Sequence, residues 1–201
     1  MIQILHSFRV TALGAAFSTF VACSGRGPNA ASATAPARPP AASAAQEVVG
    51  KASDSLAWLA VDSAARIATL ELEVTSRPGA PSAVINGSRA GELRIVVPLG
   101  WTVKWNWHSA DSTAPHSLVV MVQREKVPLE GGRASFSNAM TRMVTEGLPA
   151  GQSDQSTFVA EEAGWYWMLC GVPSHAINGE WLELRVDPDA KTAGVVLKKK
   201  A

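Results

Sequence analysis

Short runs in which apolar and polar residues alternate recur through the middle of this chain, and they constrain its fold more than any other feature. In residues 69–74, 91–97 and 102–107 apolar side chains occupy every second position, which is the period of a strand with one buried face. Turn signals such as Asn86-Gly87 and Pro98-Leu99-Gly100 separate the runs. The expected strands are 69–74, 83–86, 91–97, 102–107, 117–122, 156–160, 165–170 and 180–186, while 53–68 fits either a helix or an irregular first strand. About eight short strands with such turns predict an all-β sandwich.

The composition agrees with one packed β domain plus terminal segments. The chain has 201 residues, and its 18 Lys and Arg nearly balance its 17 Asp and Glu, so nucleic-acid binding has no electrostatic support. Seven Trp against one Tyr favour a β core over a helical bundle. We expect the folded domain to span 53–188, with a long connection at 123–155 that contains a helical turn around 138–144. Residues 189–201 are predicted to be a frayed basic tail.

The first 22 residues have the pattern of an export signal of the lipoprotein type. A mostly apolar segment at 10–21 is too short to cross a bilayer permanently but suits a signal-peptide core. It ends in Phe20-Val21-Ala22-Cys23-Ser24, which resembles a bacterial lipoprotein processing site and makes Cys23 the expected lipidated residue. The alternative is ordinary cleavage near Ala22, which leaves Cys23 as a free thiol. Residues 23–50, rich in Ala, Pro and Ser, are expected to be a flexible, disordered tether. The sequence therefore predicts a periplasmic or otherwise extracytoplasmic protein, with a lipid anchor in the membrane.

A segment between the last two expected strands concentrates metal-binding chemistry. It presents a thiol at Cys170, an imidazole at His175 and a carboxylate at Glu180, with two glycines and a proline to bend it. Such a loop can fold around one ion with ligand bonds of about 2.0–2.3 Å. Taken singly, Cys170 fits a buried structural cysteine and His175 a core or surface histidine. In an exported chain their spacing instead favours a metal site.

A second imidazole has to come from elsewhere in the chain, and two histidines compete for the place. His108 lies in a polar segment typical of a loop tip, whereas His116 opens the apolar strand 117–122 and can be rigid at the end of the domain. We therefore expect His116 to join Cys170 and His175. Two imidazoles, one thiolate and a weak fourth ligand describe a blue-copper site.

Four segments together resemble sulfocyanin, a membrane-associated branch of the cupredoxins, over about residues 58–186. They are Val97-Pro98-Leu99-Gly100-Trp101, Pro115-His116-Ser117-Leu118-Val119-Val120, Gly164-Trp165-Tyr166 and Cys170-Gly171-Val172-Pro173-Ser174-His175-Ala176. The resemblance implies a Greek-key β-sandwich that binds one type 1 copper ion through His116, Cys170 and His175 and carries electrons outside the cytoplasm. It places the family's axial methionine in a Gly-Met-Trp context. This chain has Gly179-Glu180-Trp181 there, so Glu180 becomes the expected axial ligand.

A carboxylate at the axial place changes the charge of the site. It favours the oxidised ion and lowers the reduction potential, because reduction would leave a net negative charge buried. We expect Glu180 to take up a proton on reduction; the alternative is that Glu180 swings into solvent and leaves a three-coordinate site. A carboxylate also makes the site more favourable for zinc.

The sequence is compatible with three functions. The first is a monomeric one-electron carrier, whose partner by resemblance is a cytochrome or a terminal oxidase. The second is a copper enzyme, which needs further copper sites for which the expected domain has only His108 to spare. The third is a redox-silent module that stores or delivers copper or binds zinc.

Overall fold

The computed structural model describes residues 57–198. The predicted signal peptide at 1–22, the tether at 23–50 and the lipidated Cys23 lie outside the described residues. So do residues 199–201.

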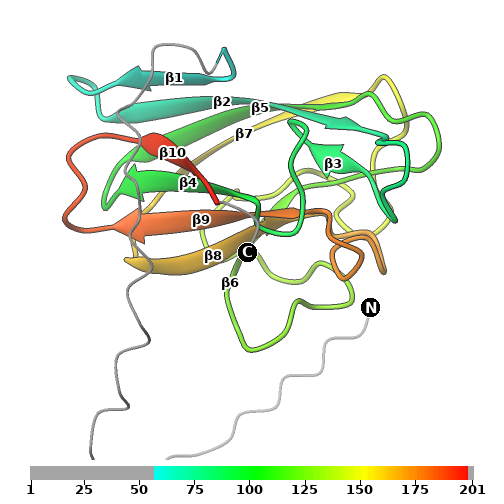
Figure 1. Ribbon diagram of the computed structural model, residues 1–201. Helices are drawn as coiled ribbons and strands as arrows, with labels where there is room; N and C mark the ends of the chain where they lie inside the picture. The colour runs from blue at the N-terminus through cyan, green and yellow to red at the C-terminus, as the bar shows by residue number, and fades with distance from the viewer. Residues whose placement is uncertain (1–56, 199–201) are drawn as a thin grey trace, which may run out of the picture. The chain divides into compact units, whose positions relative to one another are not determined.

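The described residues form two β-sheets packed face to face, and they contain ten strands (Figure 1). The strands are β1 Leu59–Asp62, β2 Ile67–Thr75, β3 Val84–Ile85, β4 Leu93–Pro98, β5 Thr102–Ser109, β6 Val119–Val122, β7 Ser153–Val159, β8 Gly164–Leu169, β9 Trp181–Asp187 and β10 Gly194–Leu197. The prediction of an all-β sandwich is confirmed. The described chain has no helix long and apolar enough to cross a membrane.

The chain crosses between the sheets repeatedly. One sheet has the order β1-β2-β5-β7 with β3 on the edge of β2, and the other has the order β10-β4-β9-β8-β6. Strands β2 and β5 pair in parallel, as do β4 and β9, whereas the remaining pairs are antiparallel. From β3 to β8 each successive strand lies in the opposite sheet, so every connection in this part of the chain passes from one sheet to the other.

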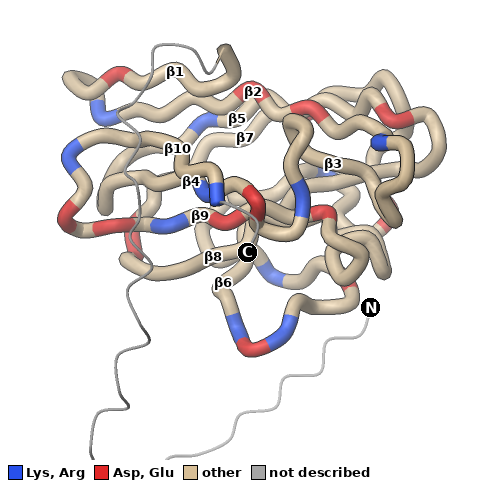
Figure 2. Tube along the Cα trace, viewed as in Figure 1, with Lys and Arg blue, Asp and Glu red and all other residues tan. Residues whose placement is uncertain are grey.

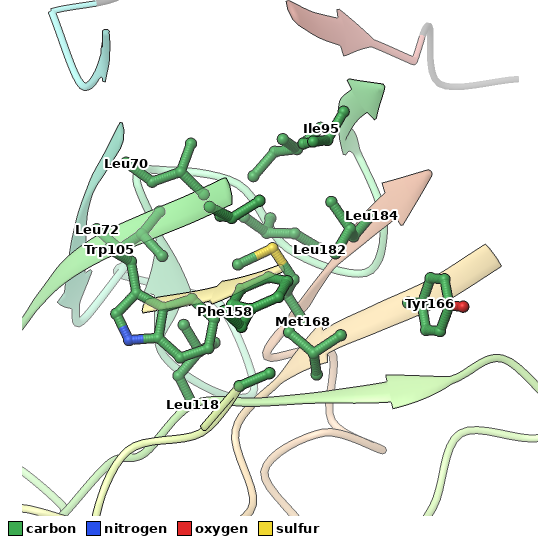
Figure 3. Packing of buried hydrophobic residues seen from close by; sticks show 14 of the residues in the cluster. Leu70, Leu72, Ile95, Trp105, Leu118, Phe158, Tyr166, Met168, Leu182 and Leu184 are labelled. Carbon is green, nitrogen blue, oxygen red and sulfur yellow. The ribbon is translucent and has the colours of Figure 1, made fainter. Parts of the chain in front are cut away.

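The core fills the space between the sheets with the inward residues of the alternating runs. Leu70 and Trp105 from one sheet meet Met168 and Leu184 from the other (Figure 3). The indole of Trp105 packs edge-on against Phe158 with ring centroids 5.5 Å apart. The predicted alternation therefore gives the correct inward faces, and burying these large side chains is the main source of stability.

The structure differs from the sequence predictions at the C-terminal boundary and in the long connection. Residues 194–197, expected in a frayed tail, form β10 and pair antiparallel with β4, so the predicted boundary at 188 is too early. The helical turn expected around 138–144 forms only as a single turn at the end of that range, closed by a hydrogen bond from Gly147 N–H to the Met143 carbonyl at 2.7 Å. This connection instead hydrogen-bonds to the edge strand β6 and the segment before it, for example from Val120 N–H to the Ala139 carbonyl at 2.9 Å.

The turn predicted at Asn86-Gly87 forms as expected. Both residues have positive φ, 47° and 73°, as a tight turn between antiparallel segments requires. Charged residues of both signs are interspersed along the trace (Figure 2), in agreement with the absence of a single-sign field in the sequence.

Candidate metal centre

Four potential ligands converge at the end of the sandwich where β8 leads into β9. His116, Cys170, His175 and Glu180 each offer one ligand atom, and these atoms all lie within 4.8 Å of one another. In residues 57–198 they are the one group of three or more His, Cys, Asp or Glu donors that is close enough to hold an ion. The loop that carries three of them is the orange segment at the right of Figure 1.

His116 enters the site from a backbone anchor just before β6. Its N–H donates to the Leu148 carbonyl at 3.1 Å, and Leu148 N–H donates back to the His116 carbonyl at 2.7 Å. The side chain is buried. By contrast, His108 lies within β5 rather than at a loop tip, and its Nδ1 contacts Ser153 Oγ at 3.0 Å. The structure thus brings His116, and not His108, to the other donors.

Cys170 directly follows β8, whose inward side chains include Tyr166 and Met168. Its sulfur accepts a hydrogen bond from Ser117 N–H at 3.4 Å, and Ser117 Oγ accepts one from Gly171 N–H at 2.9 Å. Burial, together with the nearby Glu180 carboxylate, raises the pKa of the Cys170 thiol above its ordinary value of 9.0. A metal ion would therefore have to displace the thiol proton, because the thiolate is the form that binds metal.

The loop after Cys170 is a succession of tight turns that presents His175 at the surface. Ser174 has a φ of 72°, and its N–H donates to the Leu129 carbonyl at 2.7 Å. His175 N–H donates to the Val172 carbonyl at 3.2 Å, and its side chain is 21% exposed. His175 is therefore the donor with access to solvent, while the other three are buried.

Gly179 closes the loop in a conformation that only glycine adopts readily. Its φ is 106°, and a Cβ at this position would collide with the guanidinium of Arg89. That guanidinium donates to the Asn178 carbonyl, and Ala90 N–H donates to the Gly179 carbonyl at 2.7 Å. The segment that follows β3 therefore supports the loop from behind and fixes the direction in which Glu180 leaves it.

Glu180 points into the site and is 0% exposed, so the alternative in which it swings into solvent is not the arrangement observed. One carboxylate oxygen lies 2.8 Å from His116 Nδ1, and the other lies 3.2 Å from His175 Nδ1. Burial alone would raise the pKa of Glu180, but the hydrogen bonds from His116 and His175 outweigh it and lower the pKa.

The donor set fits one type 1 copper ion. Two donors bound at about 2.0–2.3 Å to one tetrahedral ion lie roughly 3.3–3.8 Å apart. The Cys170 sulfur is 3.5 Å from His175 Nδ1 and 4.0 Å from His116 Nδ1. The carboxylate approaches both imidazoles more closely, at hydrogen-bonding distance, so a bound ion would replace the protons between them. Two imidazoles and one thiolate with a weak fourth ligand are the composition of a type 1 copper site, and here the fourth donor is the carboxylate of Glu180.

A fifth polar group at this end was missed by the sequence analysis. Asp111, between β5 and β6, is 2% exposed and lies 2.9 Å from His116 Nε2. The spacing Asp111-Ser112-Thr113 is typical of a turn in which an aspartate accepts hydrogen bonds from the residue two positions later. That pattern, close before Pro115-His116, could have revealed it.

Comparison with known proteins agrees with this site. The sequence model described as the Sulfocyanin (SoxE) domain matches residues 55–193. The chain belongs to the sulfocyanin family. A sulfocyanin from Sulfolobus acidocaldarius is 29% identical over 106 residues, which are 49% of this chain and 53% of that protein. The match therefore spans about half the length of this relative.

Solved structures that match part of the chain include auracyanin, rusticyanin and a multicopper oxidase. Auracyanin from Roseiflexus castenholzii has a TM-score of 0.42 at 22% identity, covering 59% of this chain and 97% of its own. Rusticyanin from Thiobacillus ferrooxidans has a TM-score of 0.40 at 18% identity, covering 61% and 82%. The multicopper oxidase mgLAC has a TM-score of 0.44 at 22% identity, covering 61% and 39%.

Membership of the sulfocyanin family confirms the resemblance found in the sequence. The assignment of His116, Cys170 and His175 as ligands, with Glu180 as the axial one, stays a prediction. The geometry agrees with it, because the structure brings all four side chains together.

Proposed function

We propose that this sulfocyanin is a monomeric one-electron carrier that works outside the cytoplasm with a single type 1 copper ion. The observation that carries the proposal is the convergence of two imidazoles, a thiol and a carboxylate within 4.8 Å at one end of a β-sandwich. The copper ion would accept and release one electron as it changes between Cu²⁺ and Cu⁺. His116, Cys170 and His175 would hold it, and Glu180 would be the fourth ligand.

The protein's own contribution is to keep the donors in place when the charge of the ion changes. His116 is fixed by two backbone hydrogen bonds to Leu148, and Cys170 N–H donates to the Glu180 carbonyl at 3.0 Å. Because the two ends of the ligand loop are tied to each other and to β8 and β9, the ligands need little rearrangement. A small rearrangement keeps the barrier to electron transfer low.

His175 offers the route by which electrons would enter and leave. It is the partly exposed donor. Leu129, whose carbonyl accepts a hydrogen bond from Ser174 N–H, and Ile177, in the same loop as His175, are 57% and 52% exposed. Apolar residues around an exposed ligand favour brief docking of a partner, because weak interfaces of this kind are small and release quickly. We propose a redox protein such as a cytochrome or a terminal oxidase as that partner.

The test is reconstitution of the expected mature chain, residues 23–201, with copper, followed by redox cycling. The expected result is uptake of one equivalent of copper, with a strong visible band from thiolate-to-copper charge transfer that bleaches with a mild reductant and returns on oxidation. A protein that binds copper without that band, or that cannot be cycled, would contradict the proposal.

A second function, a redox-silent module that holds a divalent metal, is favoured by one observation. Glu180 places a buried carboxylate among the donors, and oxygen ligands favour zinc more than a thioether does. Voltammetry of the copper-loaded protein separates the two functions, because Cu²⁺ binds more tightly than Zn²⁺ to most sites of such donors and affinity alone does not. A carrier gives a reversible one-electron couple, whereas a redox-silent module gives none.

We further propose that Cys23 carries a lipid that tethers the domain to a membrane. The support is the sequence Phe20-Val21-Ala22-Cys23-Ser24 after an apolar segment. Expression of the full chain in a bacterium, followed by membrane fractionation and mass spectrometry, tests it. The wild type should sediment with membranes and carry added acyl mass, and Cys23→Ala should be released; equal solubility of the two would reject the anchor.

A further inference from the structure

Asp111 is a buried carboxylate behind the predicted ligand His116. It lies in the connection between β5 and β6 and is 2% exposed. Its Oδ2 is 2.9 Å from His116 Nε2, the ring nitrogen on the side opposite Glu180 and Cys170. His116 therefore has a carboxylate at each nitrogen: Glu180 on the side of the donors and Asp111 on the far side.

The Asp111 side chain is held in a fixed position. Its Oδ1 accepts hydrogen bonds from Thr113 N–H at 2.9 Å and from the Thr113 hydroxyl at 2.8 Å. Its backbone N–H donates to the Val74 carbonyl at 3.0 Å, which ties it to the end of β2. A carboxylate fixed in this way can orient the ring that it contacts.

The contact decides which nitrogen of His116 is available to a metal. A neutral imidazole carries one N–H and one lone pair. An acceptor at Nε2 keeps the proton there, and this leaves the lone pair of Nδ1 facing the Cys170 sulfur and Glu180. The carboxylate also adds a third negative group, after the Cys170 thiolate and Glu180, near the place of the ion. Such charge favours a divalent ion over a monovalent one.

We propose that Asp111 is a positioning residue of the copper centre, which fixes the tautomer and orientation of His116 and stabilises the divalent state of the bound ion. This inference rests on the proposed function for its copper part. Its zinc part holds for any divalent ion bound by these donors. Nothing in the sequence pattern of the ligands assigns a role to Asp111.

The test compares Asp111→Asn with Asp154→Asn, the same substitution at a carboxylate outside the site. Asp111→Asn keeps the size of the side chain and removes its charge. Asp154 is the control, because it accepts a hydrogen bond from Arg142 N–H at 2.8 Å and belongs to none of the donor contacts. Dissociation constants for Zn²⁺, Cu²⁺ and Cu⁺ are measured against competing chelators, together with the reduction potential and the electron-spin spectrum of the Cu²⁺ form.

Loss of a partner of this kind weakens metal binding by about 10–100-fold. We expect Asp111→Asn to weaken Zn²⁺ and Cu²⁺ binding by this factor, to weaken Cu⁺ binding less, and so to raise the reduction potential. Asp154→Asn should change none of these. Unchanged affinities in Asp111→Asn would overturn the inference, and equal losses for Cu²⁺ and Cu⁺ would overturn its charge part.

A measurement on the unmutated protein covers the case in which Asp111→Asn does not fold. In the zinc-loaded wild type, nitrogen-15 NMR of the histidine rings should show His116 with its proton on Nε2 and slow exchange of that proton with water. A proton on Nδ1, or fast exchange, would overturn the inference. Failure of the proposed copper function is a separate result. In that case the copper-loaded wild type lacks the visible band, while the zinc measurements still test the role of Asp111.

Discussion

The interior of this protein has two regions that are equally buried and chemically opposite. Between the sheets, Leu70, Trp105 and Leu184 are excluded from water and make apolar contacts. At the end of the sandwich, His116 and Glu180 are just as buried. The first region gains free energy by burial. The second loses it, unless each polar group finds a partner.

The metal-binding end meets this requirement by pairing its own groups. Glu180 contacts both His116 and His175, and Asp111 contacts the far side of His116. Removing one partner from such a set leaves an uncompensated buried charge. The comparison teaches that burial of the core stabilises the fold, and that this stability offsets the cost of burying the polar donors close together at one end.

The largest effect on stability is expected from a cavity in the core. Trp105→Ala should lower the free energy of unfolding by about 3–5 kcal/mol, because the ring is buried against Phe158. Trp165→Ala is the control, since that side chain is 39% exposed and its ring contacts the guanidinium groups of Arg94 and Arg185. Loss of these cation–π contacts should lower the free energy of unfolding by only about 1 kcal/mol. Urea denaturation measures both. Equal losses in the two variants would contradict the division between core and surface.

The next largest effect is expected in the ligand loop. Gly179→Ala adds a side chain at a φ of 106° and displaces the end of the Arg89 side chain. It should cost about 2–3 kcal/mol, from the strained φ and the lost hydrogen bond of Arg89 to the Asn178 carbonyl, and weaken metal binding as Glu180 shifts. Gly79→Ala is the matched control, because its φ is 77° and the space around it is open; it should cost about 1–2 kcal/mol. Thermal unfolding and zinc affinity report the difference. If both glycines respond alike, Arg89 does not support the loop.

A smaller effect is expected when the negative charge of Glu180 is removed, and it concerns the reduction potential rather than the stability of the fold. Glu180→Met and Glu180→Gln should both raise the reduction potential of the copper form, because each removes a negative charge that favours the divalent ion. A tenfold change in the ratio of affinities corresponds to about 59 mV for one electron, and we expect at least this shift. Voltammetry of the three proteins provides the measurement. A potential that does not move would place Glu180 outside the ligand set.

The smallest effect is expected from pH in the protein freed of metal by a chelator. Burial alone would lower the pKa of His116, but Glu180 and Asp111 outweigh it and raise the pKa above the ordinary 6.5. The stability from this group is thus fully present below about pH 6.5 and is lost as pH rises through the raised pKa. Glu180 has the opposite effect, because its pKa is lowered from the ordinary 4.5. The stability that Glu180 contributes to the fold is fully present above about pH 4.5 and is lost as the pH falls through the lowered pKa.

Together the two groups give the metal-free protein its greatest stability between about pH 4.5 and 6.5. Denaturant midpoints measured from pH 4 to 8 test this expectation. His116→Gln should flatten the loss on the alkaline side, because the titrating group is gone. A wild-type midpoint that keeps rising from pH 5 to 8 would be incompatible with the pairing of His116 and Glu180.

The sequence was sufficient for the parts of the fold that depend on local patterns. Alternation located β2, β4 and β5, and the loop between Cys170 and Glu180 followed from residue types and spacing. It was insufficient where the outcome depends on distant contacts. Strand β10 forms because β4 offers it an edge, and the connection at 123–152 is held by contacts with β6 rather than by any period of its own.

The candidate site shows the same division. His116 was chosen over His108 because it opens an apolar strand, and the structure brings His116 to the other donors. Arg89 contacts the backbone of the ligand loop 89 residues further along the chain, and no local pattern indicates that contact. Asp111 lies only five residues before His116, so its turn pattern is local, but that pattern does not specify that the carboxylate contacts the His116 ring.

The central claim is that four side chains bind one copper ion and that the Cys170 sulfur is one of its ligands. Titration of the metal-free wild type and of Cys170→Ser with Cu²⁺, followed by visible absorption and electron-spin spectra, tests it most directly. We predict that the wild type develops an intense thiolate-to-copper band that saturates at one equivalent, and that Cys170→Ser stays without it. A colourless wild type, or a Cys170→Ser protein that keeps the band, would contradict the account.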